Sequence, residues 1–97
     1  MYTKRTEDKI ESGLLATHIS NNPGFTDACM SGDGSMIMEI IEIEMEKNNL
    51  YSKGSKKLKT EIINLLQGKS SVSPKVGQSV LFFVYNSRLS GIGLAVN

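Results

Sequence analysis

The clearest periodic pattern in the chain lies in residues 55–67, SKKLKTEIINLLQ. At about 100° per residue, the leucines and isoleucines gather in one sector of a helix and most polar side chains gather in the opposite sector. Lys59 alone falls on the apolar side. Ser55 is a favoured N-cap residue, and Gly68 is a residue type that commonly ends a helix. The pattern predicts an amphipathic helix over 55–67 whose apolar face lies on the core.

Residues 35–47, SMIMEIIEIEMEK, fit two periods. As a helix they place Glu39, Glu42 and Glu46 in one acidic stripe. Glu44 then lies apart from this stripe, among the apolar side chains. As a strand, residues 41–46 alternate isoleucine or methionine with glutamate. We favour the helix, because Ser35 is a capping residue type and the asparagines at 48 and 49 suit a helix end.

A weaker amphipathic pattern covers residues 6–20, with Ile10 and Leu14 on one side and Leu15 and Ile19 on another. It predicts a first helix at about 6–20. The segment 21–24, NNPG, is typical of a turn, because proline and glycine favour its central positions.

The C-terminal segment is rich in β-branched and aromatic residues. Residues 78–85, QSVLFFVY, favour a strand, and the alternation of large and small residues in 91–96 suggests a returning strand. A fourth helix, capped by Ser73 with Pro74 at its first position, is the alternative. We favour a β-hairpin.

Together these elements predict a single α+β domain over residues 1–97. It has three helices at about 6–20, 35–47 and 55–67 and a hairpin with strands at about 78–85 and 91–96. Two alternatives stay open. Segment 36–46 could be a strand in a three-stranded antiparallel sheet, or the fold could be all-α.

Composition agrees with one ordinary globular domain, since 39% of the 97 residues are hydrophobic and 22% are charged. The charge is unevenly distributed. Residues 1–50 hold four basic and nine acidic residues, a balance of −5, and residues 51–97 hold seven basic residues and one acid, a balance of +6. Such asymmetry is a hint of a charged partner, of self-association, or of two halves that neutralise each other.

The chemistry-bearing residues do not form a catalytic pattern. Cys29 and His18 are single, which leaves no cysteine cluster for a metal and no placed pair for acid–base catalysis. The longest apolar run, residues 80–85, is too short to cross a bilayer. We therefore expect no enzyme activity, cofactor, metal or membrane anchor, and a cytoplasmic location.

We expect instead a small regulatory or inhibitor-type protein that binds a protein partner, with a homodimer as one form of that binding. The candidate contact residues are Glu39, Glu42 and Glu46 of the acidic stripe, and Phe82 and Val84 of the hairpin.

The alternative function is nucleic-acid binding by a winged-helix-like protein. The order helix, helix, helix, hairpin is that of a winged helix, with the 55–67 helix against DNA. The residues that would contact nucleic acid are Lys53, Lys56, Lys57, Lys59, Thr60, Asn64, Lys69, Lys75 and Arg88. The connection at 48–54 is longer than a helix-turn-helix allows, the hairpin is very apolar, and the net charge is only +1.

Overall fold

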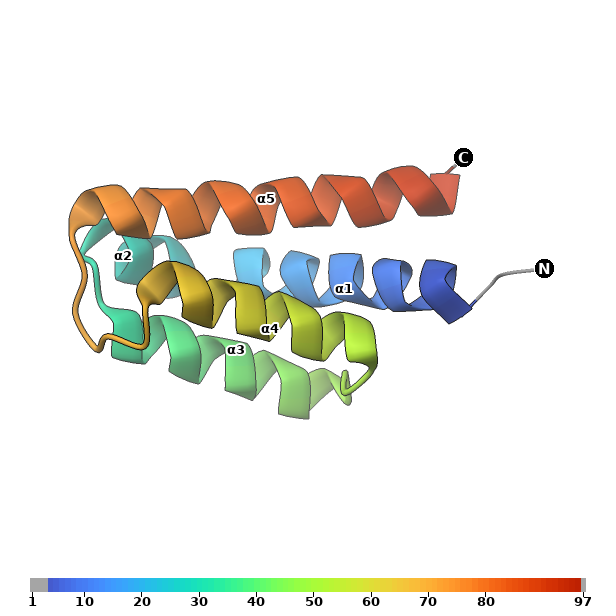
Figure 1. The fold of residues 1–97 in the computed structure, drawn as a ribbon, viewed down its shortest axis with the longest axis horizontal. Helices are drawn as coiled ribbons and strands as arrows, with labels where there is room; N and C mark the ends of the chain where they lie inside the picture. The colour runs from blue at the N-terminus through green and yellow to red at the C-terminus, as the bar shows by residue number, and fades with distance from the viewer. Residues whose placement is uncertain (1–3, 97) are drawn as a thin grey trace.

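The computed structural model describes the backbone of residues 4–96 and the side chains of residues 8–88. It consists of five helices: α1 (Lys4–Asn21), α2 (Phe25–Met30), α3 (Gly34–Asn48), α4 (Lys53–Leu66) and α5 (Pro74–Val96). The helices α1 and α5 lie side by side in opposite directions, as do α3 and α4, and α2 closes one end beneath the start of α5 (Figure 1). The core lies between the four long helices and is made of the side chains of Leu15, Ala16, Ile19, Phe25, Ala28, Cys29, Ile37, Ile40, Ile41, Met45, Leu50, Leu58, Ile62, Leu66, Val80 and Val84.

The predicted C-terminal β-hairpin is wrong, because residues 74–96 form one helix. No strand occurs between residues 4 and 96, where the sole β-type pairing is an isolated antiparallel bridge between Asp33 and Ser71. Exposure shows which period the packing follows. A strand would put Val80, Phe82 and Val84 on one face, but Val80 and Val84 are 0% exposed and Phe82 is 65% exposed. Burial at positions four residues apart is the helical period, and tertiary packing here overrides β propensity.

The structure adopts the all-α alternative. The start of α5 has the cap and the first residue that this alternative expected. The Ser73 hydroxyl accepts a hydrogen bond from the Val76 backbone N–H at 3.2 Å, and Pro74 occupies the first helical position. Proline is tolerated there because its missing N–H would have no partner inside the helix.

The three predicted helices are confirmed, with shifted ends. The helix α3 begins at Gly34, since the carboxylate of Asp33, rather than Ser35, accepts from the Met36 N–H at 3.0 Å. The helix α4 begins two residues early, because the Ser52 hydroxyl accepts from the Ser55 N–H. The strand alternative for 36–46 is thereby excluded.

The connection between α3 and α4 is shorter than the sequence suggested. It spans only residues 49–52, since Asn49 ends α3 in the left-handed conformation (φ 55°) and Ser52 already caps α4. Figure 1 shows α3 and α4 as an antiparallel hairpin of helices, not as the crossed pair of a helix-turn-helix. With α5 in place of the expected wing, the winged-helix comparison is also wrong.

Two helices approach each other closely because a glycine lies between them. A methyl group at Gly77 of α5 would overlap the backbone carbonyl of Cys29 in α2, so only glycine permits this spacing. The same is true of Gly54 at the start of α4, which rests on the Asp8 carbonyl of α1. These contacts fix where α4 lies relative to α1 and where α5 lies relative to α2.

Candidate functional site

The outward side of α3 carries acidic and apolar side chains together. We call Met36, Glu39, Glu42, Ile43 and Glu46 the acidic face, and all five are exposed. Ile43 is 46% and Met36 41% exposed, which is unusual for large apolar side chains in so small a domain. The structure therefore brings together the three predicted glutamates and adds two apolar neighbours that the sequence analysis did not single out.

The outward side of α4 is basic and polar. We call Lys53, Lys56, Lys57, Thr60 and Asn64 the basic strip, and all five are exposed. At 100° per residue they fall within an arc of about 100°, so they form one continuous face. No hydrogen bond or ion pair joins their side-chain ends to the acidic face within the described part of the chain. The prediction that the strip residues within 55–67 share a face is confirmed, and Lys53 joins them because α4 begins earlier than predicted.

One ion pair joins the acidic face to the flank of α4 that lies beside the basic strip. The Lys59 ammonium lies 3.2 Å from a carboxylate oxygen of Glu42 and links α4 to α3. This explains why Lys59 departs from the amphipathic pattern of α4, because it lies on the flank that faces α3. The remaining predicted basic residues lie elsewhere. Lys69 and Lys75 are exposed beyond the end of α4, and the Arg88 guanidinium lies 5.0 Å from the centre of the Tyr85 ring.

The two predicted contact residues of α5 have opposite positions. Phe82 points to solvent, whereas Val84 is a fully buried core residue. Val84 is therefore removed from the candidate contact surface, and Phe82 is left as an isolated exposed aromatic on the outer side of α5.

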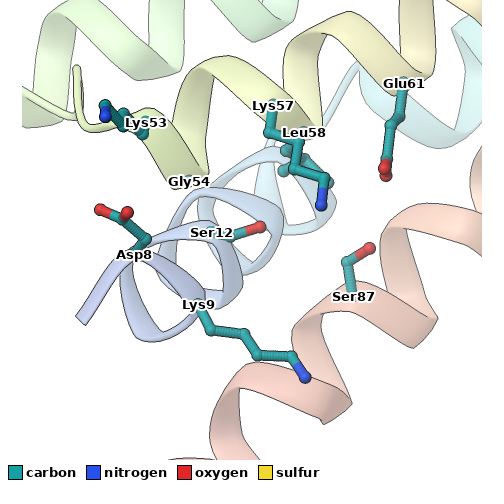
Figure 2. Close-up of a pocket in the computed structure, with 9 residues that line it drawn as sticks. All are labelled: Asp8, Lys9, Ser12, Lys53, Gly54, Lys57, Leu58, Glu61 and Ser87. Atoms are coloured by element: carbon teal, nitrogen blue, oxygen red, sulfur yellow. The ribbon is translucent and has the colours of Figure 1, made fainter. Parts of the chain in front are cut away.

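A crevice of about 600 Å³ opens between α1, α4 and α5 (Figure 2). Its lining side chains are polar apart from Leu58, and they come from all three helices. In Figure 2 the ammonium groups of Lys9 and Lys57 and the carboxylate of Glu61 reach into the space between the helices, and Ser87 lies on its α5 wall. Asp8, Ser12, Lys53, Gly54 and Leu58 complete the lining.

Sequence reasoning missed this crevice because it depends on three helices far apart in the sequence. No signal in the sequence could have placed Ser87 opposite Lys57, since residues 86–91 were expected to form a turn.

Two carboxylates, one buried and one half-buried, have structural partners. Glu44 is 5% exposed and accepts hydrogen bonds from the side-chain amides of Asn22, at 2.9 Å, and Asn48, at 3.1 Å. Glu11 accepts from the Ser52 N–H at 3.0 Å and the Ser55 hydroxyl at 3.1 Å, and so ties α1 to the start of α4. A lone acid in an apolar sector, as Glu44 was, is the sequence signal for such a buried and paired group.

The chemistry that a catalytic site needs is not assembled from the described side chains. Burial raises the pKa of the Cys29 thiol to about 12, so at neutral pH it stays protonated and is a poor nucleophile. Among residues whose side chains are described, no group of three or more His, Cys, Asp or Glu is arranged to hold a metal ion.

None of the helices, as far as they are described, is long and apolar enough to cross a membrane. Comparison with models of protein families, with curated proteins and with solved structures finds no match.

Proposed function

We propose that this chain is a non-enzymatic binding protein, that its acidic face is the contact surface, and that a second copy of the chain is the partner. The supporting observation is that two faces of opposite charge lie on neighbouring helices, joined only by the Lys59–Glu42 pair. A surface that carries both signs side by side is complementary to itself when one copy is turned over the other.

Charge selects one of the two simple ways to stack two such helix pairs. A two-fold axis across the helices would place α3 on α3 and bring the acidic faces together, which is repulsive. A two-fold axis parallel to the helices places α3 of each copy on α4 of the other, so that each acidic face meets a basic strip. This arrangement forms every contact twice.

The Lys59–Glu42 pair also shows which residues of α3 and α4 lie at the same position along the helix axis. Rotation about a two-fold axis parallel to the helices leaves that position unchanged, so the same residues meet across the two copies. Counting 1.5 Å per residue from that pair, Glu46 lies about 6 Å and Lys56 about 4.5 Å toward the same end. Glu46 of one copy therefore lies level with Lys56 of the other. This match makes Glu46 and Lys56 the pair to test.

The expected dimer is weak and sensitive to salt. Exposed ion pairs contribute little each, typically about 0–1 kcal/mol, and are screened by ions. Burial of Ile43 and Met36 adds the apolar contribution that a protein contact needs at its centre. We expect association in the micromolar range or weaker at low ionic strength.

Sedimentation velocity over a range of concentrations, at low and at 0.5 M salt, tests the proposal. Glu46→Lys and Lys56→Glu should each shift the chain to monomer, and the double variant should restore the dimer, because the pair is only exchanged. Lys75→Glu, an exposed change outside the basic strip, is the matched control and should leave association unaltered. A wild-type chain that stays monomeric at millimolar concentration and low salt contradicts the proposal.

Nucleic-acid binding by the basic strip is a second candidate, supported by the exposure of all five strip residues on one face. We rank it lower, because Glu39 and Glu46 flank α4 and would repel phosphates. Glu46→Lys separates the two candidates, since it should weaken the dimer and strengthen binding to DNA. Titration of a DNA duplex at low salt that shows no binding rejects this candidate, since phosphate-driven affinity is greatest there.

We also propose a reducing, cytoplasmic location, on the ground that the single cysteine is buried and has no disulfide partner in the sequence. Cell fractionation of a tagged chain tests this, and recovery from an oxidising compartment would contradict it.

A further inference from the structure

We propose that the crevice between α1, α4 and α5 binds a small phosphorylated, hydroxyl-bearing molecule, with its phosphate between Lys9 and Lys57 and its hydroxyl groups at Glu61. The crevice shares Lys53 and Lys57 with the basic strip, but its other lining residues lie outside the proposed contact between copies, and the two proposals are tested by different measurements.

The anion-binding part of the site is made by two helices. Lys9 comes from α1 and Lys57 from α4, and both ammonium groups extend into the crevice (Figure 2). Among the described side chains, neither lysine has an ion-pair partner. Two cationic groups in a concave, partly apolar setting focus positive potential there, and lysine is a common phosphate ligand.

Hydroxyl groups extend the list of donors available to a phosphate. Ser12 and Ser87 line the crevice from α1 and α5, and both are half-buried. The close contact of Gly54 with α1 closes the space on one side, so the site has a rigid wall made of backbone. A crevice of about 600 Å³ falls within the range of small-molecule sites.

The carboxylate of Glu61 limits which chemical groups of a ligand can lie beside it in the crevice. Glu61 is half-buried, and in Figure 2 its carboxylate extends from α4 into the crevice toward the α5 wall. A carboxylate repels a second phosphate but accepts hydrogen bonds from hydroxyl groups. The lining therefore favours a monophosphate with neutral hydroxyls over a polyphosphate or an apolar molecule.

The test uses the full-length chain with three probes: inorganic phosphate, glucose 6-phosphate and glucose. Binding is measured by isothermal titration calorimetry and by amide chemical shifts at Ser12, Gly54 and Ser87. We expect glucose 6-phosphate to bind more tightly than phosphate and glucose not to bind. Lys9→Gln and Lys57→Gln should each weaken glucose 6-phosphate binding by about tenfold or more, in line with the loss of one charged hydrogen bond.

Two further variants make the result specific. Lys75→Gln removes the same charge at an exposed position outside both the crevice lining and the basic strip, and should leave binding within twofold of wild type. Glu61→Gln should remove the preference for glucose 6-phosphate over inorganic phosphate. The proposal is overturned if none of the probes shifts the crevice amides at 10 mM. An equal effect of Lys75→Gln and Lys57→Gln would also overturn it, because the binding would then reflect overall charge.

Discussion

The helix α5 contacts the rest of the molecule differently at its start, around Gly77, and in its middle, around Ser87. We call these regions the closed end and the open end. At its start, Gly77 lets the backbone of α5 touch that of α2, and the side chains around it are apolar and fully buried. Ten residues later, at Ser87, α5 faces α4 across a crevice lined by charged groups. The closed end contributes stability through a backbone contact, whereas the open end carries charged side chains that have no ion-pair partner among the described residues. Substitutions at the two ends should therefore have very different costs.

The largest effect is expected at the closed end, for Gly77→Val. The added side chain overlaps the Cys29 carbonyl, which is part of a helix and cannot rotate away. We expect a loss of about 3 kcal/mol or more in the free energy of unfolding, as for severe overpacking. Gln78→Val is the control, because the same side chain is introduced at the next, exposed position. Urea unfolding measures both, and equal costs would contradict the backbone contact.

Two glutamates give the next comparison. Glu44 is buried and holds two asparagine amides, whereas Glu61 lines the open crevice. Glu44→Ala should cost about 2 kcal/mol, because it leaves the Asn22 amide without its acceptor and removes one of the two acceptors of the Asn48 amide, which also donates to the Glu44 backbone carbonyl. Glu61→Ala should change stability by no more than about 0.5 kcal/mol. If the two variants unfold at the same urea concentration, the hydrogen bonds of Glu44 are not structural.

Sequence patterns predicted the helices whose polar and apolar faces are separate. The helix α4 shows such separation, and four of the five residues of its basic strip lay on the polar face of the predicted helix, whereas Lys53 lay before it. The helix α5 does not, because apolar side chains surround it, including the exposed Phe82. Without an amphipathic period, the β-branched and aromatic composition favoured strands, and the packing of Val80 and Val84 against the core was not visible in the sequence.

The candidate sites divide in the same way. The acidic face and the basic strip each lie on one helix, so helical spacing predicted the three glutamates and four of the five strip residues, but not Met36, Ile43 or Lys53. The crevice joins residues 9, 57, 61 and 87, and its existence depends on how α1, α4 and α5 pack, including the close approach of α4 to α1 at Gly54. Glycines at such contacts look the same in the sequence as glycines in loops, which is why the open end could not be predicted.

The buried thiol of Cys29, which lies at the closed end, predicts that the free energy of unfolding depends on pH. Burial raises the pKa of Cys29 from 9.0 to about 12, so the folded chain keeps the thiol proton when the unfolded chain has lost it. The stabilising contribution is complete below pH 9 and is lost as the pH rises toward 12, by up to about 1.4 kcal/mol per pH unit. Cys29→Ala should show a shallower fall in urea midpoint between pH 9 and 11. Parallel curves for the two proteins would mean that the thiol ionises in the folded state.

The smallest effect is expected for Lys59→Gln, which removes the ion pair between α3 and α4. The Lys59 and Glu42 side chains are 30% and 63% exposed, so water competes for both charges. We expect a change of no more than about 0.5 kcal/mol in the free energy of unfolding, and no change at 0.5 M salt. A loss above 1 kcal/mol would contradict this expectation and would mean that the pair holds the two helices at their spacing. In that case Lys59→Gln should also weaken the proposed dimer, because the acidic face and the basic strip would no longer lie side by side.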